Sequence, residues 1–137
     1  MNTRFVPSIC SYCGSGCGVL FHVADNRILS TLPNPASPVS RGNLCIKGWH
    51  LHEHVHAPGR LTQPLMRRDA GTDLAPASWE RALARLAQGL KDTVAAHGPD
   101  SVAMLASARI TNEENYLAQK FMRAVIGTNN VDHCARL

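Results

Sequence analysis

Residues 10–18 read Cys-Ser-Tyr-Cys-Gly-Ser-Gly-Cys-Gly, and a further cysteine follows at position 45. Three thiols therefore lie on one short loop, and a fourth comes from a distant turn. This arrangement suits a cubane iron–sulfur cluster, because three neighbouring thiolates can hold one face of the cluster while the remote thiolate closes the other. Gly14, Gly16 and Gly18 allow tight turns and bring backbone N–H groups near the sulfur atoms, which stabilises an anionic cluster.

Other uses of four cysteines fit this spacing less well, although they remain alternatives. A structural zinc site usually takes its cysteines as two closely spaced pairs, whereas here the second half supplies only one. A radical-SAM cluster has the longer of its two spacers first, and here the longer spacer comes second. Disulfides are expected in oxidising compartments, but residues 1–7 contain neither a long apolar segment nor a twin arginine that would direct export.

The composition is that of an ordinary globular chain. Of the 137 residues, 45% are hydrophobic and 18% are charged, which excludes a wholly disordered protein. No run approaches the roughly 18 consecutive apolar residues of a membrane span. The net charge of +4 is modest, and the basic residues are scattered rather than gathered with aromatic side chains. We therefore expect a cytoplasmic protein with no nucleic-acid partner and no direct membrane span.

The region 1–60 is rich in Gly, Pro and Cys, and it contains short strand-like segments. One such segment is 4–9, and two others at 19–23 and 27–32 flank the turn residues Asp25-Asn26. The apolar content of this region is low. The sequence therefore predicts a small β domain that needs a bound group to be stable.

The rest of the chain has the pattern of an α/β layer. Ser78 is expected to cap a helix over 79–97, whose apolar positions recur with helical spacing. The apolar run 101–106 is typical of a buried parallel strand. Residues 111–114 form a capping box that begins a second helix, which ends at Gly127.

These elements predict an α+β protein. A small β-rich iron–sulfur domain occupies residues 1–60, and residues 61–137 form the first part of an α/β domain that begins a βαβ unit and is incomplete.

Segments of both regions resemble the molybdenum and tungsten oxidoreductases that bind bis-molybdopterin guanine dinucleotide. Residues 6–18 resemble the iron–sulfur motif of this family, residues 42–48 its fourth-cysteine segment, and residues 56–65 its usual continuation. Within the family, residues 107–116 and 127–137 look like the formate dehydrogenase catalytic subunit. The resemblance covers essentially the whole chain.

The resemblance implies a redox function and a set of site residues. Formate would be oxidised to carbon dioxide at molybdenum or tungsten, and electrons would pass through a [4Fe–4S] cluster to an electron-transfer subunit or a ferredoxin-like acceptor. Lys47 matches the lysine that the family places between cluster and pterin. Ser107, Arg109 and Asn112 follow a strand and lie near a helix N-terminus, so we expect them to contact the guanine-dinucleotide part of the pterin cofactor. The implied cluster ligands are Cys10, Cys13, Cys17 and Cys45.

The resemblance also bears on the end of the chain. In the formate dehydrogenases, position 138 would be the cysteine or selenocysteine that binds the metal. We therefore expect the N-terminal piece of a selenocysteine-type catalytic subunit, cut at a UGA codon read as a stop, whose partner is the remainder of that subunit. Such a piece contains no catalytic residue. The alternatives are a stand-alone [4Fe–4S] electron-transfer protein and a fragment of a related nitrate reductase.

Two further groups of potential ligands are interpreted without a metal role. Histidines alternate with other residues from position 50 to position 56, but a helix would bring only pairs of them to one face. We expect this segment to be a polar surface. Cys134 lies four positions before the expected metal ligand, and we expect a buried or half-buried structural cysteine there.

Overall fold

The structure, a computed structural model, describes the following parts of the chain: residues 2–68, 71 and 73–134, without the side chain of residue 134. Its strands and helices confirm the α+β class. The chain divides into two compact units, the first made of residues 1–60, 105–118 and 132–137, and the second of residues 61–104 and 119–131. Because a compact unit can take segments from more than one domain, the domain boundary expected at residue 60 stays a prediction.

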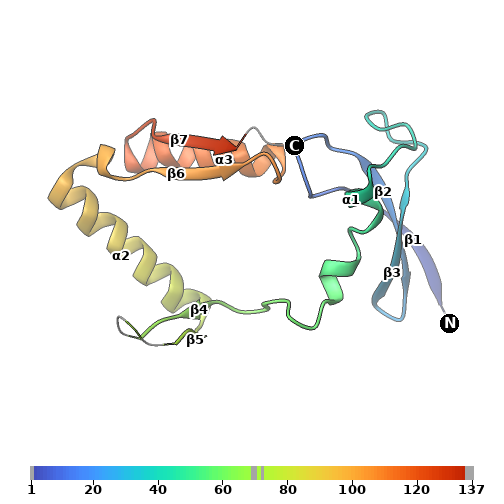
Figure 1. Cartoon of the computed structure of the whole chain (residues 1–137), viewed down its shortest axis with the longest axis horizontal. Coiled ribbons are helices and arrows are strands. Elements are labelled where there is room, and N and C mark those ends of the chain that lie inside the picture. Colours follow the sequence, from blue (N-terminus) through green and yellow to red (C-terminus); the bar gives the residue numbers. More distant parts are fainter. Residues whose placement is uncertain (1, 69–70, 72, 135–137) are drawn as a thin grey trace. The chain divides into compact units, whose positions relative to one another are not determined.

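A three-stranded antiparallel sheet forms the centre of the first unit (Figure 1). Its strands are β1 (Thr3–Ile9), β2 (Gly18–Ala24) and β3 (Arg27–Pro33), in the order β1-β2-β3. Asp25 and Asn26 join β2 to β3 with φ angles of 46° and 61°. Two successive positive φ angles are typical of the type I′ turn, which matches the twist of a hairpin. The predicted hairpin is confirmed.

The apolar core of the first unit is small. Cys10, Val19 and Leu51 are buried together. Half-buried side chains pack around them: Tyr12, Cys17, Phe21 and Leu44. Because little apolar surface is buried and two of these residues are cysteines, the stability of this unit depends on the conformation of the cysteine loop.

The histidine segment packs back against β3. It follows the short helix α1 (Ile46–Trp49) and includes the short helix η1 (Glu53–His56). The side-chain oxygen of Thr31, which is 2% exposed, accepts a hydrogen bond from the backbone N–H of His52 at 3.2 Å and lies 3.1 Å from its Nδ1. His56 Nε2 accepts from the backbone N–H of Ile28 at 3.0 Å. His52 is half-buried, so it departs from the polar surface expected of this segment, whereas the other three histidines are exposed as expected.

Replacing Thr31 by valine is expected to lower the free energy of unfolding by about 1–3 kcal/mol. Valine keeps the shape of threonine but leaves the His52 N–H without its acceptor at a buried position. The measurement is urea denaturation of the full-length protein. Thr3→Val is the matched control, because Thr3 is exposed on β1. Equal stability of the two variants would contradict a structural role for the Thr31 hydroxyl.

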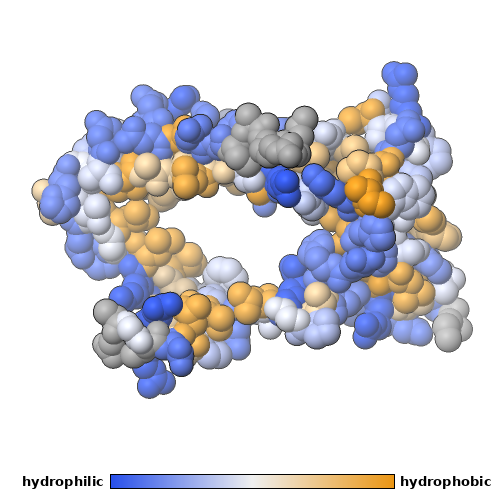
Figure 2. Space-filling view, viewed as in Figure 1, coloured by the Kyte–Doolittle hydropathy of each residue, from blue (hydrophilic) through white to orange (hydrophobic). Residues whose placement is uncertain are grey.

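The second unit contains the longest helix of the described residues. It includes these elements: β4 (Leu65–Met66), β5 (Ala75–Pro76), α2 (Trp79–His97) and η2 (Pro99–Ser101). As predicted, Ser78 caps α2: its Oγ accepts from the backbone N–H of Arg81 at 3.2 Å. Gly98, with a φ of 81°, ends the helix. Apolar side chains of α2 are exposed (Figure 2), among them Trp79, Leu83 and Leu86.

A strand, a helix and a second strand follow in the order of a βαβ unit. They are β6 (Met104–Ser107), α3 (Asn112–Phe121) and β7 (Val131–Cys134). The two strands pair in one sheet, and their arrows point the same way (Figure 1). The strand predicted at 101–106 begins later, at Met104, because the short η2 helix that starts at Pro99 includes Ser101 and has Val102 as its C-cap residue.

The ends of α3 follow the predicted signals. Thr111 Oγ1 accepts from the backbone N–H of Glu114 at 3.2 Å, and the Glu114 carboxylate accepts from the backbone N–H of Thr111 at 2.7 Å. This reciprocal pair confirms the capping box. The π-helical turn η3 (Met122–Ile126) extends α3 to Gly127, whose φ of 90° ends it. None of the helices in the described residues is both long and apolar enough to cross a membrane.

Candidate metal centre

The cysteine loop is a closed turn between β1 and β2. The backbone N–H of Cys10 donates to the carbonyl of Cys17 at 2.8 Å, so the two ends of the loop meet. Gly16 has a φ of +66°, a conformation that residues with side chains rarely adopt. Cys45 is the N-cap residue of α1. The fourth thiol thus comes from the start of a helix that is remote in sequence.

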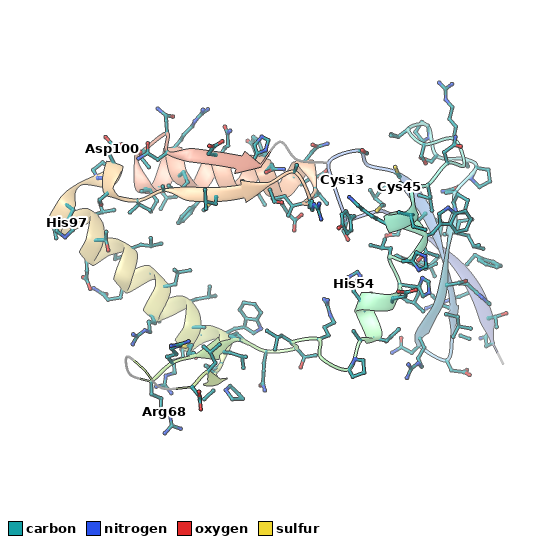
Figure 3. The ribbon with its side chains drawn as sticks, in the orientation of Figure 1. Cys13, Cys45, His54, Arg68, His97 and Asp100 are labelled. Carbon is teal, nitrogen blue, oxygen red and sulfur yellow. The ribbon has the colours of Figure 1, made fainter. Side chains whose placement is uncertain are left out.

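The four predicted ligands line one cavity of about 240 Å³. All four are free thiols; Cys10 is buried, Cys13 and Cys17 are half-buried, and Cys45 is exposed. In Figure 3, Cys13 and Cys45 lie near each other, where the loop faces α1. The structure therefore brings together the local three cysteines and the remote one.

The thiols offer a donor set that suits a cluster. Within the described part of the chain, no group of three or more His, Cys, Asp or Glu side chains is placed to hold a single metal ion. A cubane core is bound by thiolates and is several ångströms wide. Four free thiols around a cavity provide the donor set and the space for such a core.

The thiols influence one another before any iron is bound. Burial raises the pKa of the Cys10 thiol, and the neighbouring Cys13, Cys17 and Cys45 raise it further by charge repulsion. Hydrogen bonds from Ser15 lower the pKa of Cys13, whose Sγ lies 3.4 Å from the Ser15 Oγ. Four thiolates in one small cavity repel each other, and positively charged iron relieves that repulsion.

Two cationic side chains line the same cavity. Lys47 Nζ lies 4.8 Å from the centroid of the Tyr12 ring. The guanidinium carbon of Arg109 lies 5.9 Å from that centroid, and Arg109 Nη1 donates to the Tyr12 hydroxyl at 3.1 Å. Lys47, Arg109 and Tyr12 all belong to the cavity wall. The structure thus brings two residues predicted for the pterin side to the cysteines.

The other predicted pterin residues make contacts within the protein. Asn112 Nδ2 donates to the backbone carbonyl of Gly14 at 2.8 Å, so it holds the cysteine loop. A Cβ atom on Gly14 would lie 2.6 Å from Asn112 Oδ1, which explains why a glycine suits this position. Ser107 Oγ accepts from the backbone N–H of Arg109 at 3.0 Å, and the Ser107 carbonyl accepts from Asn115 at 3.1 Å. Contact of these residues with a pterin stays a prediction.

Two of these contacts have no signal in the sequence. The cysteine motif only places Tyr12 between two proposed ligands, and the position of Asn112 beside a helix start predicts a contact with the cofactor instead. Their partners lie 97 and 98 positions away in the chain. The helix signal at residues 111–114 placed Asn112 on the first turn of α3, but it did not indicate what that turn faces.

Replacing Asn112 by alanine is expected to make the bound cluster bleach several-fold faster in air. The change removes the hydrogen bond to Gly14, worth about 1 kcal/mol, and frees the loop that carries three thiols. The measurement is the decay of the visible absorbance of the full-length protein. Asn129→Ala is the control, since Asn129 is exposed and lines none of the cysteine cavity. Equal decay rates would contradict the clamp.

A larger cavity of about 680 Å³ lies in the second unit, along α2. Apolar side chains make up most of its wall, with Arg67 and Arg85 at its polar parts. Among the described residues that line it, none is Cys, His, Asp or Glu. Although this cavity is larger, the candidate metal ligands, which are the four cysteine thiols, line the smaller cavity.

Comparison with known families matches both regions of the chain. The molybdopterin oxidoreductase Fe4S4 domain matches residues 3–57, and the molybdopterin oxidoreductase domain matches residues 60–137. The chain belongs to the molybdopterin oxidoreductase family. These two domains imply a [4Fe–4S] cluster and a molybdopterin cofactor for the protein. They agree with the resemblance drawn from the cysteine loop and the fourth-cysteine segment.

Several characterised or named proteins of this family are similar to the chain. The F420-dependent formate dehydrogenase 1 subunit alpha of Methanococcus maripaludis is 47% identical over 137 residues, which is 100% of this chain and 19% of that protein. The F420-dependent formate dehydrogenase subunit alpha of Methanocaldococcus jannaschii is 41% identical over the same shares. The NADPH-Fe(3+) oxidoreductase subunit alpha of Geobacter sulfurreducens is 40% identical over 96% of this chain and 15% of that protein. The chain thus spans less than a fifth of the length of these molybdopterin oxidoreductases.

Proposed function

We propose that the chain is the cluster-carrying N-terminal segment of a formate dehydrogenase alpha subunit. The observation that carries this proposal is the cavity formed by four free cysteines, with Lys47 and Arg109 in its wall. The chain is similar over its whole length to proteins named as formate dehydrogenase subunits alpha, and this similarity supports formate as the substrate. The partners are then the remainder of the catalytic subunit and an electron-transfer subunit or ferredoxin-like acceptor. The expected compartment is the cytoplasm.

In this proposal, Cys10, Cys13, Cys17 and Cys45 are the ligands of the [4Fe–4S] cluster. When bound, the cluster takes up and releases one electron at a time. Burial of Cys10 keeps water from one side of the site, and the positive charges of Lys47 and Arg109 lie where a reduced, more negative cluster gains most from them. Ser107, Arg109 and Asn112 are proposed to face the pterin cofactor.

Anaerobic purification of the native product tests the proposal. We expect roughly four iron atoms per chain, as a cubane requires, together with molybdenum or tungsten, an electron paramagnetic resonance signal on reduction, and formate oxidation by the full-length protein. Zinc in place of iron would support the alternative of a structural zinc site and overturn the proposal. A cluster without pterin or formate oxidation would favour the stand-alone electron-transfer protein.

A second activity is favoured by the similarity to the Geobacter sulfurreducens NADPH-Fe(3+) oxidoreductase subunit alpha. The same cluster segment could then pass electrons that originate from NADPH. Reduction of the cluster by formate but not by NADPH in the purified complex distinguishes formate dehydrogenase from this alternative. Re-oxidation of the chemically reduced cluster by nitrate, with release of nitrite, would point to the nitrate reductase relative.

We further propose that the enzyme is of the selenocysteine type. Residues 127–137 resemble the segment that precedes the metal ligand in formate dehydrogenases, where that ligand is a cysteine or a selenocysteine. Selenium analysis of the purified full-length protein tests this point. Selenium is expected in the protein, and its absence would overturn this part of the proposal.

A further inference from the structure

Tyr12 has a fixed place at the cysteine cavity. It lies between the proposed ligands Cys10 and Cys13, and its half-buried ring packs against the core formed by Cys10, Val19 and Leu51. The ring is therefore held by the apolar core on one side. Its remaining surface belongs to the wall of the cavity that the four thiols line.

The same ring contacts both cations of the cavity. Lys47 Nζ, 4.8 Å from the ring centroid, is within the range of a cation–π interaction. Arg109 is held twice, by the ring at 5.9 Å and by the hydrogen bond from its Nη1 to the hydroxyl at 3.1 Å. In the described part of the chain, neither cation has a carboxylate within salt-bridge distance.

Without this ring, no other described contact would offset the repulsion between the two cations. Two positive charges repel each other, and a lysine side chain gains conformational freedom and hydration when it extends into water. The electron-rich face of Tyr12 attracts both charges and offsets that repulsion. The ring thus keeps two positive charges beside four thiols.

We propose that Tyr12 is a positioning residue, which holds Lys47 and Arg109 at the wall of the cysteine cavity and thereby raises the reduction potential of the cluster bound there. The proposal rests on the ligand roles proposed above for the four cysteines. Its physical basis is that a reduced cluster carries more negative charge than an oxidised one, so nearby cations stabilise the reduced form more.

Two substitutions in the full-length, cofactor-loaded protein separate the ring from its hydroxyl. Tyr12→Leu removes the ring and releases both cations, and it is expected to shift the midpoint potential of the cluster to a lower value. Tyr12→Phe removes only the bond to Arg109, and a smaller shift in the same direction is expected. The measurement is a redox titration followed by electron paramagnetic resonance, with iron content determined for each variant.

The control for loss of an aromatic ring is Phe5→Leu. Phe5 is exposed on β1, stacks on His22 with 5.0 Å between ring centroids, and does not line the cavity. Its midpoint potential is expected to equal that of the unsubstituted protein. A shift as large as that of Tyr12→Leu would mean that any aromatic loss in this unit disturbs the cluster, and it would overturn the proposal.

Double variants show whether Tyr12 acts through the cations. Lys47→Met and Arg109→Gln are each expected to lower the potential on their own. Adding Tyr12→Phe to Arg109→Gln is expected to cause no further shift, because the hydroxyl then has no guanidinium left to hold. Adding Tyr12→Leu to the Lys47→Met, Arg109→Gln pair is likewise expected to change nothing more. Additive shifts would overturn the proposal.

The outcomes remain decisive if one variant is unstable. Should Tyr12→Leu fail to retain iron, Tyr12→Phe and its double variant decide alone, and an unchanged potential in Tyr12→Phe at full iron content overturns the proposal. A protein without substitutions that shows no cluster signal would instead overturn the proposed function. A normal cluster signal with unshifted Tyr12 variants would leave that function standing and remove only the role of Tyr12.

Discussion

Replacing Cys45 by serine is expected to abolish the stable [4Fe–4S] cluster in the full-length protein. Cys45 is the only proposed ligand outside the cysteine loop, and it caps α1 at the exposed side of the cavity. A serine oxygen is a poor substitute for a thiolate on iron, and the remaining three thiols cover only one face of a cubane. We expect loss of most iron, loss of the signal of the reduced cluster and loss of electron transfer from formate.

Cys134→Ser is the matched control for this experiment. The backbone of residue 134 lies in β7, and its side chain lies outside the described residues, so its expected structural role stays a prediction. Cys134 is not one of the four proposed ligands, and it lies far along the chain from all of them. Full iron content in Cys134→Ser with iron loss in Cys45→Ser is the expected pair of results. The reverse pair would mean that Cys134, and not Cys45, completes the ligand set.

Gly18→Ala is expected to destabilise the first unit by about 1–3 kcal/mol and to lower cluster occupancy, as overpacking of a buried position does. A Cβ atom at Gly18 would lie 2.5 Å from the Cβ and 2.7 Å from the Oγ of Ser37, which is itself 5% exposed. The backbone N–H of Gly18 also donates to the hydroxyls of Ser37 and Ser40, each at 3.2 Å. The added methyl group therefore pushes the backbone at residue 18 away from Ser37 and displaces the end of the cysteine loop.

Gly59→Ala provides the comparison for this substitution. Gly59 belongs to the same unit, and a Cβ atom there would meet nothing within 4 Å. Its free energy of unfolding and its iron content are expected to match those of the unsubstituted protein. If Gly18→Ala proved as stable as Gly59→Ala, the close contact between Gly18 and Ser37 would not constrain the site.

The local elements were predicted correctly where short-range chemistry decides them. The turn at Asp25 and Asn26, the cap at Ser78 and the capping box of Thr111 and Glu114 each depend on residues within a few positions of one another. The predicted start of β6 was wrong by three residues. The η2 turn after Gly98 competes with an extended chain there, and apolar periodicity does not indicate such a turn.

The sequence alone determined which four cysteines are proposed as the donor set, because thiolate chemistry and the spacing of three local cysteines and one remote cysteine favour a cluster. Only the tertiary structure decided what surrounds those thiols. Arg109 bonded to Tyr12 and Asn112 bonded to Gly14 join segments nearly a hundred residues apart. Such pairs leave no periodic pattern in the chain, since a hydrogen bond between distant segments depends on how the whole backbone folds and not on the spacing of the residues.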